Sequence, residues 1–323
     1  MQTYRLIFSS VSVLNQIPDA QTIFGALCGI IKKKDGEKVL NAYLDSLRTN
    51  EPWFVHSSMF PLDLFPFPSE NLFSLEFIEK FIDSQKDGES KLFLFSEFKK
   101  YKKLKYVSVG ILTEYILSGR LDQLRKDLLT KQEKFSIIED QEILRLREET
   151  ITFQSVNVLS IRNSIRKDSL DKDLFYESQL FVPKDQQFQV LVKTDQDIGR
   201  IRLYFSLLEY TGIGSNRSVG MNSFHLENIE EFHFENQNER AYLLSKCIPE
   251  KEEFDFEQSS YRVDSKLFRG SNTYVYGDYV GRFTRLLEGS LCKPAKKKEY
   301  YGQLISIFMD GKIIDHYGIG MVV

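Results

Sequence analysis

Two strand-then-helix patterns constrain the fold of this 323-residue chain most strongly. Apolar residues alternate within residues 3–10, which is typical of a half-buried strand, and then recur at helical spacing over residues 23–31. The same pairing returns at residues 187–193, which alternate, and at residues 198–208, whose apolar residues form one helical stripe. A chain with this pattern is expected to fold as an α+β protein.

The chain between these two patterns contains a less regular region and then two further strands. Residues 40–150 include a Pro-rich and Phe-rich stretch between two helical patterns, and we interpret this region as an insertion. Strand patterns follow at residues 150–161 and 173–182, with a polar basic segment between them. Residues 183–185, Pro-Lys-Asp, are typical of a turn, so a hairpin is predicted across them.

The order of these elements predicts the fold of the N-terminal part. Strand, helix, strands, helix, glycine-rich loop and strand follow one another as in a βαββαβ ferredoxin-like domain with a long insertion. Its second helix is predicted to begin at a capping box of Thr194 and Asp197. Residues 227–257 then hold ten acidic and three basic side chains, which indicates a boundary. We predict domains at 1–227 and 228–323, the second being a smaller ferredoxin-like domain.

Composition limits the classes of function. The net charge of -3 argues against a free-standing nucleic-acid binder, because affinity for phosphate normally comes from a basic excess, so any RNA site has to be local. The three cysteines have no CxxC spacing, and no metal or cofactor site is predicted. The N-terminus does not read as a secretion signal, and no run approaches the ~20 apolar residues that span a bilayer. A cytoplasmic chain without membrane contact is expected.

The most distinctive motif is the glycine-rich stretch TGIGSNRSVGMNSF at residues 211–224. Gly212, Gly214 and Gly220 allow sharp turns or close approach of a ligand. Successive backbone N–H groups in such a loop can bind an anion, and the guanidinium of Arg217 can bind a phosphate. Dinucleotide-binding loops follow a strand and precede a helix, whereas this stretch follows a helix. Its spacing alone leaves a structural turn and a phosphate site both open.

This stretch resembles the glycine-rich loop of RAMP proteins, in which a pattern close to GIGGKRSxGxGxF follows the second helix of an RRM-like domain. Ser215, Asn216 and Asn222 depart from that pattern. Three other stretches resemble the same family in the right order, namely PDAQTIFGALCGII, RNSIRKDSLDKDLFYESQLF and HYGIGMVV. Taken together, the chain is most similar to the handle-capping RAMP subunits of type III-A CRISPR effector (Csm) complexes.

The resemblance implies a non-catalytic RNA-binding subunit of an antiviral interference complex. Such a subunit would bind the 5′ handle of the CRISPR RNA, cap the filament of the backbone RAMP subunit, and dock the large polymerase-like Csm subunit. The residues that the resemblance places against RNA are those of the loop, Gly212, Gly214, Asn216, Arg217, Ser218 and Gly220, and those of a basic segment, Arg162, Asn163, Arg166 and Lys167.

Two lysine-rich stretches are open to two interpretations each. The stretch KPAKKKEYY at residues 293–301 contains Lys296 and Lys297, and its lysines and tyrosines suit phosphate contact with base stacking, or else a solvated loop. The stretch EFKKYKKLKY at residues 97–106 could also face a nucleic acid. For this second stretch a solvated helix face is the preferred interpretation.

Two alternative functions remain open at this stage. A RAMP-type endoribonuclease would need a general acid and base, usually including histidine. The histidines are His56, His225, His233 and His316; none lies in the first strand or helix, so no catalytic residue is predicted, and His56 is the one to mutate first. The other alternative is a subunit that binds only proteins through its acidic and aromatic-rich segments.

Overall fold

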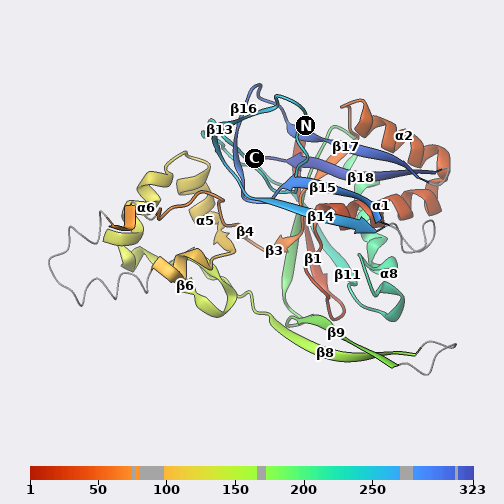
Figure 1. Cartoon of the computed structure of the whole chain (residues 1–323), viewed down its shortest axis with the longest axis horizontal. Helices are drawn as coiled ribbons and strands as arrows, with labels where there is room; N and C mark the ends of the chain where they lie inside the picture. Colours follow the sequence, from red (N-terminus) through yellow and green to blue (C-terminus); the bar gives the residue numbers. More distant parts are fainter. Residues whose placement is uncertain (75–76, 80–97, 166–171, 270–278, 310–311) are drawn as a thin grey trace. The chain divides into compact units, whose positions relative to one another are not determined.

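The computed structural model describes residues 1–74, 77–79, 98–165, 172–269, 279–309 and 312–323 (Figure 1). Helices and strands are both abundant, which confirms the predicted α+β class. The chain divides into two compact units. The first comprises Met1–Leu62 and Thr152–Phe232, and the second comprises Asp63–Ile151 and His233–Val323. Each unit is therefore made from two separate stretches of the sequence.

The first unit is built on an antiparallel sheet with the order β11–β1–β10–β2. Strand β1 (Gln2–Ser10) lies between β10 (Gln187–Thr194) and β11 (Phe224–Glu231). The other edge of β10 pairs with β2 (Phe54–His56) and β3 (Phe60–Pro61). With the helices between them, these elements follow one another along the chain as βαββαβ.

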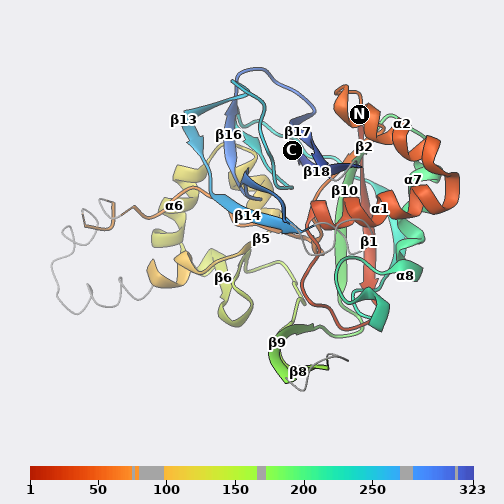
Figure 2. The same ribbon diagram turned by 45° about the vertical axis from the view of Figure 1, so that its right-hand side comes forward.

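Four helices complete this unit, and α1 contacts α2, α7 and α8 (Figure 2). They are α1 (Ala20–Asp35), α2 (Glu37–Arg48), α7 (Ile198–Ser206) and α8 (Leu208–Thr211). Helix α1 begins after Asp19, whose carboxylate accepts a hydrogen bond from the Thr22 N–H at 3.0 Å. The apolar residues predicted to form its inner face are all buried, namely Ile23, Phe24, Leu27, Ile30 and Ile31.

The predicted capping box of α7 is wrong, because Thr194 is not the N-cap and Asp197 takes that position. Asp197 is the N-cap, since its carboxylate accepts a hydrogen bond from the Gly199 N–H at 3.0 Å. Thr194 is the last residue of β10, and its hydroxyl donates to the Trp53 carbonyl at 2.7 Å. The threonine hydroxyl therefore ties the end of the strand to the neighbouring chain and does not cap the helix.

The predicted hairpin across residues 183–185 is also wrong. Strand β8 (Val156–Ile165) pairs with β9 (Lys172–Phe181) in a separate two-stranded ribbon (Figure 1). Strand β10 lies in the interior of the sheet of the first unit, where it pairs with β1, β2 and β3. Every residue from Phe188 to Val192 is buried, as is typical of an interior strand. Strands β2 and β3 lie inside the region that the sequence indicated to be an insertion.

The N-terminal part of the second unit is a small sheet with the order β4–β5–β7–β6 and several short helices. The strands are β4 (Leu64–Pro66), β5 (Tyr106–Ser108), β6 (Phe135–Ile138) and β7 (Ile143–Leu146). The helical segments with printed bounds are α5 (Val109–Ile111), η1 (Leu112–Ile116), α6 (Leu121–Thr130), η2 (Gln132–Lys134) and η3 (Glu139–Gln141), and residues 77–79 and 98–102 are helical as well.

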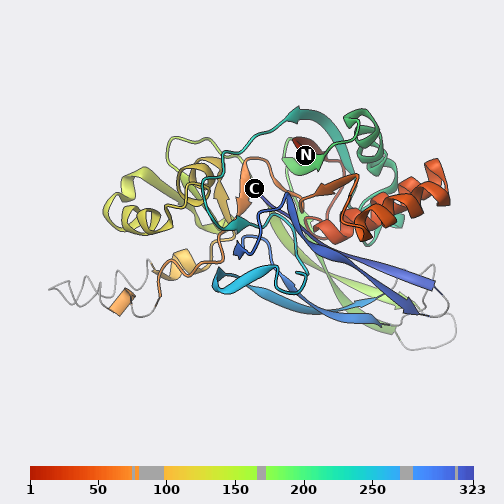
Figure 3. The ribbon, with the colours of Figure 1, turned by 90° about the horizontal axis from the view of Figure 1, so that it is seen from above.

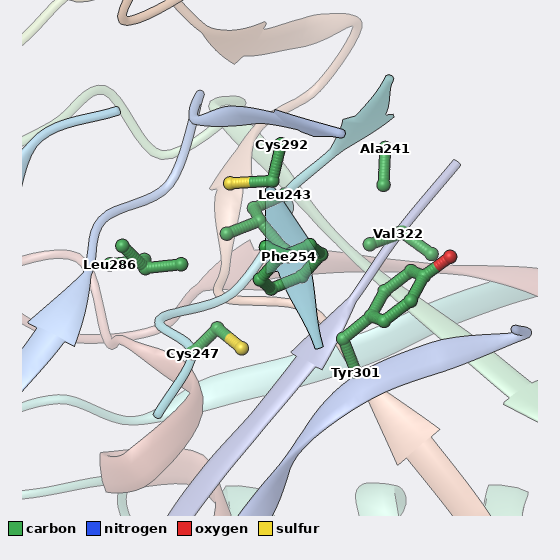
Figure 4. Packing of buried hydrophobic residues seen from close by; sticks show 8 residues of the cluster. All are labelled: Ala241, Leu243, Cys247, Phe254, Leu286, Cys292, Tyr301 and Val322. Carbon is green, nitrogen blue, oxygen red and sulfur yellow. The ribbon is translucent and has the colours of Figure 1, made fainter. Parts of the chain in front are cut away.

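The regular elements described in the C-terminal part of the second unit are strands. A three-stranded sheet contains β12 (Ala241–Tyr242), β16 (Leu291–Pro294) and β13 (Phe254–Ser260). Two pairs of longer strands accompany it (Figure 3). In one, β14 (Val263–Arg269) pairs with β15 (Tyr279–Leu286), and in the other, β17 (Tyr300–Met309) pairs with β18 (Lys312–Met321). The core here includes the free thiols Cys247 and Cys292 beside Phe254 and Tyr301 (Figure 4). Burial raises the pKa of the Cys292 thiol to about 12.

These units differ from the predicted domains 1–227 and 228–323. Strand β11 continues to Glu231, and the Phe232 N–H donates to the Thr3 carbonyl, so the first unit extends past residue 227. Helix α2 contacts α1, so the separate region begins near residue 63 and not near 40. In the described part of residues 233–323 we find no helix of the kind that a second βαββαβ domain requires.

Candidate RNA-binding site

The glycine-rich loop is a closed structure that joins α8 to β11. The Ile213 N–H donates to the Asn222 carbonyl at 2.9 Å, which closes the loop at its base. Gly212 has φ +64°, and a Cβ atom there would lie 2.9 Å from the Arg217 Cβ and 3.2 Å from the Met221 carbonyl oxygen. Glycine is therefore required at this position by both backbone conformation and space.

Two departures from the RAMP pattern have a backbone explanation. Asn216 and Asn222 both have φ +58°, in the left-handed region that asparagine tolerates better than most residues. Asn222 is buried, and its side-chain amide donates to the Asn15 Oδ1 at 2.9 Å and to the Ser215 carbonyl at 2.6 Å. An asparagine can therefore replace glycine here, and its side chain adds hydrogen bonds that hold the loop closed.

The tip of the loop is exposed. Residues Arg217–Val219 form a single 3-10 turn, η4, and the side chains of Arg217 and Ser218 face solvent. The Arg217 side chain forms no hydrogen bond or ion pair with another described residue, although its backbone carbonyl accepts a hydrogen bond from the Gly220 N–H at 3.1 Å. Gly220 has φ +81° with open space around it. A guanidinium on a fixed turn, with its donors available, can bind a phosphate or stack on a base.

Glu177 in β9 connects the loop to the β8–β9 ribbon. Its carboxylate accepts hydrogen bonds from the side-chain amide of Asn216 and, at 3.4 Å, from that of Asn15. Its other oxygen pairs with the Arg162 Nε at 3.0 Å. The structure thus brings together Asn216 and Arg162, two of the predicted RNA-binding residues, through an acidic residue that the sequence analysis did not select.

The remaining residues of the predicted basic segment are only partly described. Asn163 lies in β8 opposite Leu174. Arg166 and Lys167 lie outside the described residues. The ribbon also exposes several large apolar side chains, namely Val156, Leu159, Ile161, Leu174 and Tyr176. Arg162 is 47% exposed, so its guanidinium reaches solvent although its Nε is paired with Glu177.

Lys296 and Lys297 belong to the second unit and are exposed between β16 and β17. Their loop is fixed by the Tyr301 hydroxyl, which accepts from the Lys298 N–H at 3.0 Å and donates to the Lys296 carbonyl at 3.2 Å. The Lys298 Nζ lies 2.7 Å from the Glu253 Oε1.

The lysines of the stretch at residues 97–106 include Lys100, which pairs with Glu139, and Lys105, which pairs with Glu142.

The histidines differ sharply in their access to solvent. His56 is fully buried against Phe54 and Phe205, and this burial lowers its pKa to about 4. His225 is 48% exposed, and its Nδ1 lies 2.6 Å from the Glu209 Oε2. The hydrogen bond that the imidazole donates to the Glu209 carboxylate raises the pKa of His225. A buried neutral imidazole cannot reach an RNA substrate, whereas His225 has the solvent access and the carboxylate partner of a general acid or base.

The described residues contain no group of His, Cys, Asp and Glu side chains that could hold a metal ion. No helix in the described ranges is long and apolar enough to cross a membrane.

Comparisons with known proteins identify solved structures that have a similar fold. No family model matches the chain, and no curated protein sequence matches it. A chain of the Csm3–Csm4 subcomplex in the type III-A CRISPR-Cas interference complex matches with a TM-score of 0.61 and 15% identity, covering 98% of this chain and 99% of that one. A chain of the Csm1–Csm4 cassette in complex with pppApA matches with a TM-score of 0.55 and 16% identity, covering 99% and 97%. The protein therefore has, over nearly its whole length, the fold of a chain found in type III-A CRISPR-Cas assemblies.

Proposed function

We propose that this protein is a Csm4-type RAMP subunit of a type III-A CRISPR-Cas complex. The observation that carries the proposal is the match in fold over 98% of the chain to a chain of the Csm3–Csm4 subcomplex. Csm4 is the component common to that assembly and to the Csm1–Csm4 cassette. The first unit, with its βαββαβ order and glycine-rich loop, is then the ferredoxin-like RAMP domain.

The RNA ligand in this proposal is the 5′ handle of the CRISPR RNA, bound at the glycine-rich loop. Arg217 is the central contact, because it is exposed on a fixed turn and its donors are not used by the described residues. Gly212, Gly214 and Gly220 shape the backbone, and Ser218 adds a hydroxyl beside the guanidinium. Asn216 and Arg162 support this surface while they are paired with Glu177.

The protein partners in this proposal are the large subunit Csm1 and the backbone subunit Csm3. The two assemblies with this fold each join Csm4 to one of these proteins. The subunit itself is proposed to be non-catalytic, to cap the backbone filament and to act in the cytoplasm. The burial of His56, the histidine to mutate first, supports this view because its imidazole cannot reach RNA.

Co-expression tests the assembly. The tagged full-length chain is produced with Csm1 and Csm3 proteins of the same source and with a CRISPR array, and the purified material is analysed for protein and for RNA. We expect both partners and a guide RNA of discrete length to co-purify. Co-purification of the proteins without RNA would favour the alternative of a subunit that binds proteins only.

Substitution of Arg217 tests the site. We expect Arg217→Ala to weaken the binding of a single-stranded RNA carrying the handle sequence by about tenfold, because one charge-assisted contact contributes ~1.4 kcal/mol. Arg202→Ala is the matched control, since Arg202 is an exposed arginine on α7 of the same unit. Equal affinity of the Arg217→Ala and parent chains for handle RNA, measured at the same salt concentration, would refute the site assignment.

The pair of His225 and Glu209 makes an endoribonuclease the second candidate. A carboxylate 2.6 Å from the Nδ1 orients an imidazole for proton transfer. Glu209 lies in α8, before the glycine-rich loop, and His225 lies at the start of β11, after it. The same binding experiment distinguishes the two functions if the RNA is recovered and its length measured. Cleavage by the parent chain that is lost in His225→Ala would favour the nuclease.

A further inference from the structure

Glu177 lies between the two parts of the proposed RNA-binding surface. One carboxylate oxygen accepts hydrogen bonds from Asn216 of the glycine-rich loop and from Asn15, and the other pairs with Arg162 of β8. The Glu177 side chain is only 14% exposed. These donors therefore replace much of the water that an ionised carboxylate would otherwise bind.

Asn15 extends this network to the base of the loop. Its backbone N–H donates to the Asn222 Oδ1 at 2.7 Å, and its Oδ1 accepts from the Asn222 amide at 2.9 Å. The preceding residue, Leu14, exchanges two backbone hydrogen bonds with Leu180 of β9, at 3.1 and 2.7 Å. Continuous hydrogen bonds thus run from the β8–β9 ribbon through Glu177 and Asn15 to Asn216 and Asn222 of the loop.

We infer that Glu177 is a positioning residue that fixes the glycine-rich loop and the β8–β9 ribbon relative to each other, so that one RNA strand contacts both. The inference rests on the proposed function. Without the carboxylate, Arg162 and Asn216 lose their shared partner, and only the hydrogen bonds of Leu14 and Asn15 still connect the ribbon to the loop, so Arg162 and Asn216 are held less firmly relative to each other. RNA binding then has to order them, and the cost of that ordering lowers the affinity.

The RNA affinity of Glu177→Gln distinguishes two roles of Glu177, because its charge and its positioning of the loop and ribbon predict opposite changes in that affinity. A carboxylate near RNA repels phosphate, so its charge alone predicts that Glu177→Gln binds RNA more tightly. Positioning predicts weaker binding, since glutamine retains one acceptor oxygen but loses the ion pair with Arg162. Glu177→Asp keeps the charge and shortens the side chain, so charge alone predicts the parent affinity and positioning again predicts a loss.

The experiment measures the affinity of the purified full-length chain for a fluorescently labelled single-stranded RNA with the handle sequence. We expect Glu177→Gln and Glu177→Asp each to weaken binding by about fivefold, with Arg217→Ala measured in parallel. Glu37→Ala is the control for loss of one negative charge and should leave the affinity unchanged, because Glu37 is an exposed residue at the start of α2 that pairs with Lys32 of α1. Thermal unfolding of each variant verifies that it is folded.

The outcomes separate this inference from the proposed function. If Glu177→Gln binds RNA as well as the parent or more tightly, while Arg217→Ala still weakens binding, the inference is overturned and the proposed function stands. If the parent chain does not bind the RNA, the proposed function fails and the inference fails with it. If a Glu177 variant does not fold, Asn15→Ala replaces it, because this substitution removes one donor to Glu177 without a change of charge. Parent-like binding by Asn15→Ala also contradicts the inference.

Discussion

The environment of His56 determines the charge state of its imidazole. His56 lies beside two serines in a region interpreted as an insertion, yet it is the last residue of β2 and is fully buried. Its Nδ1 lies 3.0 Å from the Ser57 carbonyl oxygen, and its ring contacts those of Phe54 and Phe205. The side chain is therefore part of the core of the first unit.

This burial predicts a loss of stability in mild acid. The pKa of His56 falls from 6.5 to about 4 on folding, so between these values the unfolded chain binds a proton there and the folded chain does not. The free energy of unfolding should therefore fall as the pH falls from 6.5 toward 4, by up to ~1.4 kcal/mol per pH unit from this residue. Urea unfolding at pH 7 and pH 5 measures the change.

The substitution His56→Phe isolates the contribution of this residue. Phenylalanine has no titrating group and keeps an aromatic ring against Phe54 and Phe205. We expect the variant to lose less stability than the parent between pH 7 and pH 5. The same loss in both chains would show that His56 does not titrate differently in the folded and unfolded states.

At the scale of elements, the spacing of apolar residues predicts those helices and strands that depend on contacts between residues close in sequence. The strand at residues 3–10 and the helix with its buried face at Ile23 to Ile31 were predicted because alternation and helical spacing are set by neighbours in sequence. The partners of β10 were not, because β9, which is adjacent in sequence, pairs elsewhere. Strand β2 has three residues, all buried, which is too short for any alternation to be recognised.

The candidate site shows the same limit. Arg217 was predicted because it lies within a glycine-rich motif that is contiguous in sequence. Glu177 was not, because its contact with Asn216 joins residues 39 apart and becomes visible only when β9 is placed against the loop. The sequence also gave no reason to expect that Arg162 would be paired with an acidic residue.

Strand β18 and its neighbour β17 provide a prediction about close packing of backbones. Gly302 in β17 has φ +78°, and a Cβ atom there would lie 2.3 Å from the Gly318 carbonyl oxygen and 2.7 Å from the Cys247 Sγ. We expect Gly302→Ala to lower the free energy of unfolding of the second unit by more than about 2 kcal/mol, because backbone strain and overpacking add. Urea denaturation gives the difference.

Gly119 provides the matched control for that substitution. It belongs to the same unit and has φ +71°, but its nearest neighbour would be 3.8 Å from an added Cβ atom. Gly119→Ala should therefore cost only about 1 kcal/mol, the backbone term alone. Similar losses for the two variants would mean that the crowding around Gly302 relaxes at little cost.

At the scale of the whole molecule, the second unit is assembled from two stretches that are far apart in sequence. Phe65 contacts Phe234 ring to ring, Glu70 pairs with Arg240 at 2.8 Å, and the Asn238 side chain donates to the Ile116 carbonyl at 2.8 Å. The strands after residue 233 therefore depend on residues 63–151 for part of their packing and hydrogen bonding.

This dependence predicts that the C-terminal part does not fold alone. A fragment of residues 233–323 leaves the partners of Phe234, Arg240 and Asn238 absent, so we expect it to show no cooperative unfolding transition by circular dichroism. A chain that joins residues 63–151 to residues 233–323 through a flexible linker retains all of the second unit and should unfold cooperatively. A cooperative transition of the 233–323 fragment by itself would show that its strands form an independent core, and the contacts with residues 63–151 would then be an interface between two separately stable parts.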